Sequence, residues 1–232
     1  TITASVGAEL PNINYSEPGY ATEVDWLLCD ALDQLSQPGG TSGYLRLSTR
    51  PIDQAPFAAV LDSMGEDRLR DFVLAGGYRL VDAPPDGRPA VTIATTGAMA
   101  PEALAAAAEL DSEGVQATVV HLTSPNRVYQ TWRSGFAQST ASARVVRAPS
   151  HLHRLVPAIE RRRPIVSVHD AASHSLAWLG SALGTRQYAL GVDRFGESGT
   201  IADLHEITGI DAGSIVNAAL IATSEADTYS DE

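Results

Sequence analysis

Residues 90–122 read AVTIATTGAMAPEALAAAAELDSEGVQATVVHL, and this stretch decides the fold. Its first six residues are apolar and rich in β-branched side chains, which is typical of a buried strand. Pro101 then stands in the favoured first turn of an alanine-rich helix over residues 102–110, and Gly114 ends that helix. Residues 117–122 form a second apolar run. A strand, a helix and another strand in close succession predict parallel strands joined through a helix.

The same alternation continues toward the carboxyl terminus. Continuously apolar strands indicate a sheet that is buried on both faces, so the predicted fold class is α/β, with a mainly parallel sheet and helices on both faces. A Pro/Gly-rich stretch at 82–89 separates this part from an earlier one. Beyond the first unit, we expect strands at 43–48, 78–81, 164–169 and 188–192, and helices at 23–35, within 57–72, and at 126–132, 152–163, 176–183, 201–208 and 212–223.

Composition places the chain among folded proteins that do not bind nucleic acid. Of its 232 residues, 44% are hydrophobic and 19% are charged, which is too apolar for a disordered chain. The formal net charge of −12 disfavours nucleic acid and anionic membranes as partners, because both require a local excess of cations. No stretch approaches the roughly 18 apolar residues of a membrane span, and the first residues do not resemble a signal peptide. We therefore expect a cytoplasmic protein. The missing initiator Met fits a natural chain that begins further upstream, and a processed terminus is the alternative.

Two further features have simple structural interpretations. Cys29 is the single cysteine, which excludes an internal disulfide and indicates a reducing compartment. It ends an apolar run that begins at Trp26, so we expect a buried side chain that fills space. The basic run at 161–163 precedes Pro164 and is interpreted as a solvated helix end, with a phosphate or carboxylate contact as the alternative.

Most motifs of enzyme chemistry are missing. The sequence has no phosphate-binding glycine loop with a Lys-Ser/Thr ending, no Gly-x-Gly-x-x-Gly and no Gly-x-Ser-x-Gly. His169 and Asp170 end a predicted strand, and the carboxyl ends of parallel strands line ligand crevices. An acid/base or ligand role for this pair is one hypothesis, and a local hydrogen bond or helix cap is the other. His151 and His153 are interpreted as a polar helix start.

Residues 191–200, GVDRFGESGT, place three glycines close together after a strand and predict a constrained loop before a helix. In structural terms, we interpret this loop as a turn that positions the final helices. Together with Leu204, this segment resembles the carboxyl-terminal domain of the transketolase superfamily, and in particular the homodimeric type of pyruvate dehydrogenase, the thiamine-diphosphate-dependent decarboxylating component. Residues 12–24, 120–124 and 164–170 resemble other segments of that family, in the same order along the chain.

The resemblance implies a domain division and a set of partners. Residues 1–82 would be the tail of a pyrimidine-binding domain, 90–223 a transketolase-type carboxyl-terminal domain, and 224–232 a polar tail. In the family, a Gly-Asp-Gly metal motif and an activating glutamate serve thiamine diphosphate and Mg²⁺, and both lie outside this chain. The full-length parent would therefore bind thiamine diphosphate and Mg²⁺, whereas we expect no cofactor on this chain alone. Implied partners are the remainder of the parent enzyme, a homodimer partner and a lipoyl-bearing acyltransferase.

The resemblance also implies candidate site residues. The family has an active-site tyrosine in the context Asn-x-x-x-Tyr-Asp-Pro, and Tyr15 is assigned to it, with Ser16 in place of the aspartate. His169 and Asp53 are added as further candidates for the catalytic site. The family's substrate-contacting histidine has no counterpart within 51–56, so another 2-oxo acid or a ketose donor is an alternative to pyruvate.

Three functions follow as hypotheses. The first is a carboxyl-terminal fragment of a thiamine-diphosphate-dependent 2-oxo acid dehydrogenase or transketolase-like enzyme, which supports the dimer and the active-site wall and is inactive alone. The second is a non-catalytic assembly or regulatory module on the same fold. The third is one chain of a split enzyme, because fold does not fix function.

Overall fold

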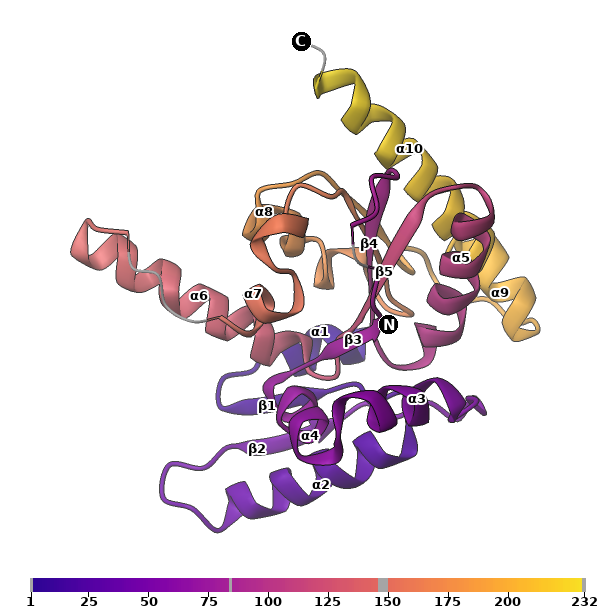
Figure 1. Cartoon of the computed structure of the whole chain (residues 1–232). Coiled ribbons are helices and arrows are strands. Elements are labelled where there is room, and N and C mark those ends of the chain that lie inside the picture. Colours follow the sequence, from indigo (N-terminus) through magenta and orange to yellow (C-terminus); the bar gives the residue numbers. More distant parts are fainter. Residues whose placement is uncertain (1, 84, 146–149, 231–232) are drawn as a thin grey trace.

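The computed structural model describes residues 2–83, 85–145 and 150–230, and it contains two β-sheets (Figure 1). In the smaller sheet, β1 and β2 pair in parallel. The larger sheet has five strands in the order β3-β5-β4-β6-β7, and only β3 is antiparallel to its neighbour. The predicted α/β fold with a mainly parallel sheet is thus confirmed. The strands are β1 (Ile13–Ser16), β2 (Ser42–Leu45), β3 (Tyr78–Val81), β4 (Ala90–Thr95), β5 (Gln116–His121), β6 (Ile165–Val168) and β7 (Gln187–Leu190).

Helices surround both sheets. In Figure 1, α5 and α10 lie along one side of the larger sheet, α7 and α8 lie on the other, and α2, α3 and α4 gather around the smaller sheet. The helix α6 projects away from the body of the molecule. The helices are α1 (Ile2–Glu9), α2 (Ala21–Leu35), α3 (Ala55–Met64), α4 (Glu66–Ala75), α5 (Ala100–Ser112), α6 (Pro125–Ser142), α7 (His151–Leu155), α8 (Trp178–Leu183), α9 (Ile201–Thr208) and α10 (Ala212–Ser230).

The larger sheet forms the centre of the core. Every residue of β5 and β6 is buried, as expected for strands that are covered on both faces. Ala103 and Ala106 of α5 are fully buried, and their small side chains bring this helix close to the sheet. Burial of these side chains is the main source of stability, at about 25 cal/mol per Å² of apolar surface.

One hydrophobic cluster joins the two parts of the chain. Trp26, Phe57 and Phe72 come from the helices around the smaller sheet, and they belong to the same cluster as Val119 and Val166 of the larger one. Strand β3 also pairs with the larger sheet, although it precedes the Pro/Gly-rich stretch. The carboxyl ends of strands from both sheets are thereby held against each other.

Three local expectations differ from the structure. The helix expected at 152–163 is interrupted around Pro157, so α7 ends at Leu155 and a short 3-10 helix follows at Ala158–Glu160. The stretch expected as a polar tail continues α10 as far as Ser230. The prediction that Cys29 is buried is wrong, because Trp26 and Leu27 occupy the inner face of α2 and leave Cys29 exposed.

One segment, Ile201–Glu225, is long and apolar enough to cross a membrane by length and composition, with a mean hydropathy of 1.2. It consists of two helices, because Gly209 adopts a left-handed conformation (φ 67°) and ends α9. In α10, Ile215, Ala219 and Ala222 are fully buried. The helix α10 therefore packs as a core helix of a folded protein does.

Candidate functional site

The carboxyl ends of four strands meet at one edge of the molecule. Each of β1, β2, β4 and β6 runs directly into a polar residue at this edge: Glu17, Arg46, Thr96 and His169. Parallel strands present their carboxyl ends together, and such edges commonly carry the ligand crevice of an α/β protein. We call the group formed by Glu17, Arg46, His169 and Asp170 the edge quartet.

Glu17 is the centre of the edge quartet and is 1% exposed. Its two carboxylate oxygens lie 2.8 and 2.9 Å from Nε2 of His169, and Nη1 of Arg46 donates to Oε2 at 3.0 Å. Thr96 adds a hydroxyl donor at 3.1 Å. The backbone of Glu17 is also fixed, because its N–H donates to the carbonyl of Thr123 at 2.8 Å and its carbonyl accepts from Gly97 at 3.2 Å. A buried carboxylate with this many donors is held in one position.

Both ring nitrogens of His169 have hydrogen-bond partners. Nε2 faces the carboxylate of Glu17 at 2.8 Å. On the other side of the ring, Nδ1 lies 2.6 Å from the hydroxyl of Ser175, which also lies 2.6 Å from the carbonyl oxygen of Ala172. These two contacts fix the orientation of the ring.

Arg46 connects the two carboxylates of the edge quartet. Its Nη1 lies 2.6 Å from Oδ1 of Asp170, and Nη2 donates to the carbonyl of Asp170 at 3.3 Å. Burial opposes the charge of Arg46, but hydrogen bonds and Coulomb attraction from Asp170 and Glu17 outweigh it, and the pKa of Arg46 is raised. The edge quartet therefore links β1, β2 and β6 through ionic hydrogen bonds.

A cavity of about 280 Å³ lies beside His169. Tyr15 forms part of its wall, is 1% exposed and stacks on Tyr44 with ring centroids 5.6 Å apart. The Tyr15 hydroxyl has no hydrogen-bond partner among the residues that the structure describes. A phenol and an imidazole on aromatic walls suit a small carbonyl-bearing ligand. The other polar and aromatic lining residues are Ser5, Glu9, Asn126, Tyr129, His174, Ser175 and Trp178.

Of the three predicted site residues, the structure brings two together. Tyr15 and His169 line the same cavity. Asp53 does not join them, because it lies just before α3 and its Oδ1 accepts from the N–H of Ala55 at 3.0 Å, a local turn contact.

Sequence reasoning did not single out Glu17 and Arg46. The sequence did contain a signal for Glu17. When the Asn-x-x-x-Tyr-Asp-Pro motif is aligned on Pro18, its aspartate position falls on Glu17. Its tyrosine position then falls on Ser16, one residue after Tyr15.

A second buried acid has a structural role. Glu23 is fully buried in the first turn of α2, and its Oε2 accepts from the N–H groups of Gly19 at 2.7 Å and Tyr20 at 3.0 Å. His121 Nε2 lies 3.3 Å from the same oxygen. Burial, together with the charge of Glu23, raises the pKa of Tyr20 and of Tyr78, so both phenols stay protonated. Glu23 caps its helix within a closed aromatic cluster.

His151 is buried at the start of α7 rather than forming a polar surface. Its Nε2 lies 2.7 Å from the carbonyl oxygen of Gly77, and its ring packs edge-on against Phe72 at 5.2 Å. Burial is the main cause that lowers the pKa of His151. The polar start that the sequence indicated is therefore a packed, neutral histidine.

This histidine makes the folded state sensitive to acid. Below the unfolded-state pKa of about 6.5, the unfolded chain takes up a proton at His151 that the folded chain resists. The free energy of unfolding should therefore fall as the pH drops from 7.5 to 5.5, with His151 contributing a slope of up to about 1.4 kcal/mol per pH unit. Urea unfolding at several pH values measures this, and His151→Gln should flatten the profile. Equal slopes for both proteins would contradict the assignment.

The described residues do not fit the diphosphate and metal part of a thiamine cofactor. Glu17, His169 and Asp170 are close enough to share a metal ion, with ligand atoms within 4.8 Å of one another. The guanidinium of Arg46 already lies against Oε2 of Glu17 and Oδ1 of Asp170, where a cation would have to sit. No other metal-binding group of this kind occurs in the part of the chain that the structure describes.

These features define a class: an α/β protein whose mainly parallel sheet carries a polar site at its carboxyl edge. Residues 76–211, more than half of the chain, match the family model described as the transketolase-like TK C-terminal domain. The chain therefore belongs to this family, within the transketolase superfamily. No curated protein sequence matches it.

Solved structures of transketolases share the fold. A transketolase mutant from Pichia stipitis is 20% identical, with a TM-score of 0.65 over 96% of this chain and 27% of that one. A transketolase from Leishmania mexicana is 19% identical, with a TM-score of 0.58 over 97% and 27% of the two chains. A split-gene transketolase, described as an inactive β4 tetramer, is 22% identical, with a TM-score of 0.62 over 95% and 61%. This chain thus spans only about a quarter of the first two proteins and 61% of the third.

Proposed function

We propose that this chain is the carboxyl-terminal region of a thiamine-diphosphate-dependent enzyme, either a 2-oxo acid dehydrogenase of the pyruvate dehydrogenase type or a transketolase-like enzyme. In this proposal it is inactive alone and supports the dimer and one wall of the active site. The observation that carries the proposal is the edge quartet beside the cavity of Tyr15 and His169. It joins residues 1–82, proposed as the end of a pyrimidine-binding domain, to residues 90–223, proposed as the carboxyl-terminal domain.

The chain's own residues would bind and orient the substrate. Tyr15 lines the cavity with a buried hydroxyl that has no partner among the described residues, and the imidazole of His169 belongs to the same lining. Both would favour a bound carboxylate or a carbonyl oxygen. Asp53 lies outside this cavity. It would contribute to the active site only if another part of the assembled enzyme packs against it.

Residues outside this chain would bind the cofactor. Thiamine diphosphate supplies an electron sink for decarboxylation when it is bound, and Mg²⁺ would hold its diphosphate. The described residues offer no open metal site, which supports a cofactor held by the remainder of the parent enzyme and a homodimer partner. A cytoplasmic location and a lipoyl-bearing acyltransferase as acyl acceptor complete the proposal.

The test compares this chain with the natural polypeptide that contains it. Near-ultraviolet circular dichroism should detect binding of thiamine diphosphate and Mg²⁺ to the full polypeptide and no binding to this chain alone. The loaded full polypeptide should reduce ferricyanide with a 2-oxo acid such as pyruvate or 2-oxobutyrate. Activity only with a ketose phosphate and an aldose acceptor would replace the dehydrogenase assignment with a transketolase-like one. A natural chain with no upstream segment would exclude the fragment proposal.

A split enzyme is the second candidate, and the similarity to one chain of a split-gene transketolase favours it. In that case, a separate chain would supply the cofactor-binding residues. Analytical ultracentrifugation of this chain with a candidate partner chain should then show a mixed complex, and cofactor binding should appear only in the mixture. A non-catalytic assembly module would form a complex without gaining cofactor binding or activity.

Replacing Tyr15 by phenylalanine separates a catalytic role from a structural one. Because the Tyr15 hydroxyl is buried without a partner, its removal should leave the free energy of unfolding unchanged or raise it by up to about 1 kcal/mol. If the hydroxyl contacts the substrate, the same variant should lower kcat/KM of the full enzyme by about tenfold to a hundredfold. Tyr44→Phe is the matched control, since that ring stacks on Tyr15 and lies outside the cavity lining. Unchanged kcat/KM in Tyr15→Phe would remove Tyr15 from the site.

A further inference from the structure

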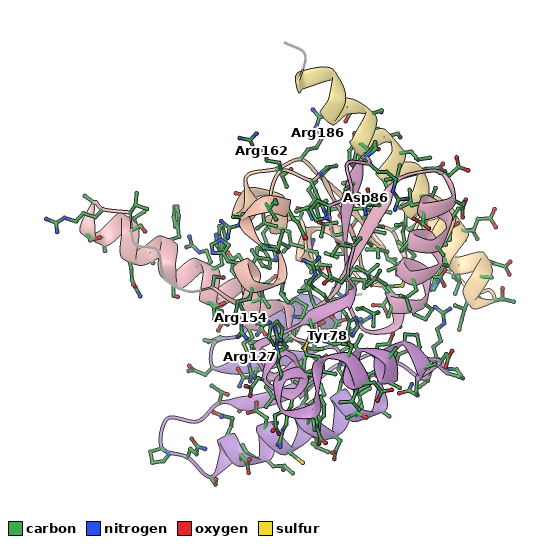
Figure 2. The ribbon with its side chains drawn as sticks, viewed as in Figure 1. Tyr78, Asp86, Arg127, Arg154, Arg162 and Arg186 are labelled. Atoms are coloured by element: carbon green, nitrogen blue, oxygen red, sulfur yellow. The ribbon has the colours of Figure 1, made fainter. Side chains whose placement is uncertain are left out.

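A second cavity lies at the opposite edge of the larger sheet. It has a volume of about 300 Å³ and is bounded by the residues before β4, the start of β5 and the residues before β6. It therefore lies at the amino ends of these parallel strands, whereas the edge quartet lies at their carboxyl ends. In Figure 2, Arg162 lies at this end of the molecule, with Asp86 at the same end and Tyr78 far below.

Three arginines line this cavity, and no acidic residue lines it. Arg163 is fixed, because its side chain is 9% exposed and Nη1 donates to the carbonyl of Ala83 and the hydroxyl of Thr118, both at 3.1 Å. The same Nη1 forms an ion pair with Glu160 at 3.8 Å. Arg88 is held at the rim by Asp86 and Asp111, each at 2.8 Å. Arg162 is exposed and has no ion-pair partner among residues 2–83, 85–145 and 150–225. One guanidinium is thus available beside two that are already positioned.

Arg162 is thus a cation without an acidic partner among the described residues, in a chain whose formal net charge is −12. The chain has no lysine, and arginine binds phosphate oxygens through two parallel N–H donors. The wall also contains apolar surface: Ile159 is 75% exposed, and Pro85 and Pro89 lie beside it. The cavity thus combines a cationic part with an apolar part that would accept the organic portion of a ligand.

We propose that this cavity binds a diphosphate-bearing small molecule, with Arg162 and Arg163 on the phosphate groups and Ile159 on the organic portion. The proposal takes up the alternative that the sequence left open for the run at 161–163, a contact with phosphate, and assigns it to Arg162 and Arg163. The proposal does not depend on the enzyme assignment, because the two sites lie at opposite edges of the sheet and share no residue.

Isothermal titration calorimetry of the chain with pyrophosphate and with ADP, at constant ionic strength, tests the site. Both probes should bind at micromolar to submillimolar concentration, and Arg162→Ala should weaken binding about tenfold or more. Arg162→Lys should be intermediate, since it keeps the charge and loses the paired donors. The control is Arg186→Ala, because Arg186 lies at the same end of the molecule, pairs with Glu225 and does not line the cavity.

Several outcomes would overturn the proposal. Equal weakening by Arg162→Ala and Arg186→Ala would show diffuse attraction to surface charge. Citrate binding as tightly as pyrophosphate would show an unspecific anion site. No measurable heat with either probe would show no site at all. ADP binding more tightly than pyrophosphate, with the difference lost in Ile159→Ser, would support the assignment of the organic portion to the apolar wall.

Discussion

Replacing Glu17 by glutamine is expected to lower the free energy of unfolding by about 3 kcal/mol. The substitution keeps the size and shape of the side chain, so no cavity accounts for the loss. It removes the negative charge that accepts from His169 at 2.8 Å and from Arg46 at 3.0 Å, at a position that is 1% exposed. His169 and Arg46 would then both lose the carboxylate that they contact. Urea unfolding followed by far-ultraviolet circular dichroism measures the change.

Asp170→Asn is the matched control within the edge quartet. Asp170 also contacts Arg46, but its side chain is 27% exposed, so water replaces part of the interaction and the expected loss is roughly 1 kcal/mol or less. The double variant Glu17→Gln with His169→Gln should lose less than the sum of the two single variants, because removing both partners leaves no unpaired charge. Similar decreases in the free energy of unfolding for Glu17→Gln and Asp170→Asn would show that the buried Glu17–His169 contact stabilises the fold no more than the partly exposed Asp170 contact does.

The larger sheet could be predicted because the residues that specify each strand and helix are close together in the sequence. The apolar runs at β4 and β5 and the alanine-rich helix between them indicate a parallel sheet without knowledge of the rest of the chain. His169 and Asp170 were also identified, since residues at strand ends can be located from the sequence. The exposure of Cys29 was missed, because an apolar run does not tell which of its residues face the core. The interruption around Pro157 could have been predicted, because a proline inside a helical pattern ends or kinks the helix.

The edge quartet could not be predicted, because its members are brought together only by tertiary packing. Glu17 and His169 are 152 positions apart in the sequence, and Arg46 and Asp170 are 124 apart. No spacing rule connects strand ends that lie in different sheets. The anion contact offered as an alternative for 161–163 could not be located from the sequence for the same reason, since the cavity that Arg162 lines is built from four separate segments of the chain.

The loop at 191–200 allows the second large prediction, because two of its glycines differ sharply in their surroundings. A Cβ atom on Gly191 would lie 2.6 Å from the carbonyl oxygen of Ala171 and 2.6 Å from Cα of Ser173, and it would also collide with the backbone nitrogen of Ser173. These are backbone atoms that cannot rotate away. The strand end is further fixed there, because Val192 N–H donates to Ala171 O at 2.8 Å and Ser173 N–H donates to Asp193 at 2.9 Å. The loop therefore supports the segment that follows His169.

Gly191→Ala is therefore expected to lower the free energy of unfolding by about 1–3 kcal/mol, because the backbone of 171–173 must move to admit one methyl group. Gly196→Ala is the control from the same loop: no atom lies within 4 Å of its added Cβ, so stability should change by less than about 1 kcal/mol. Chemical denaturation of both variants measures this difference. A shift of the His169 ring signals in the NMR spectrum of Gly191→Ala, and none in Gly196→Ala, would show that the motif acts by positioning the strand end that carries the site. Equal stability of the two variants would instead mean that the loop can move to admit the methyl group without loss of stability. The close backbone contacts would then not explain the glycine at position 191.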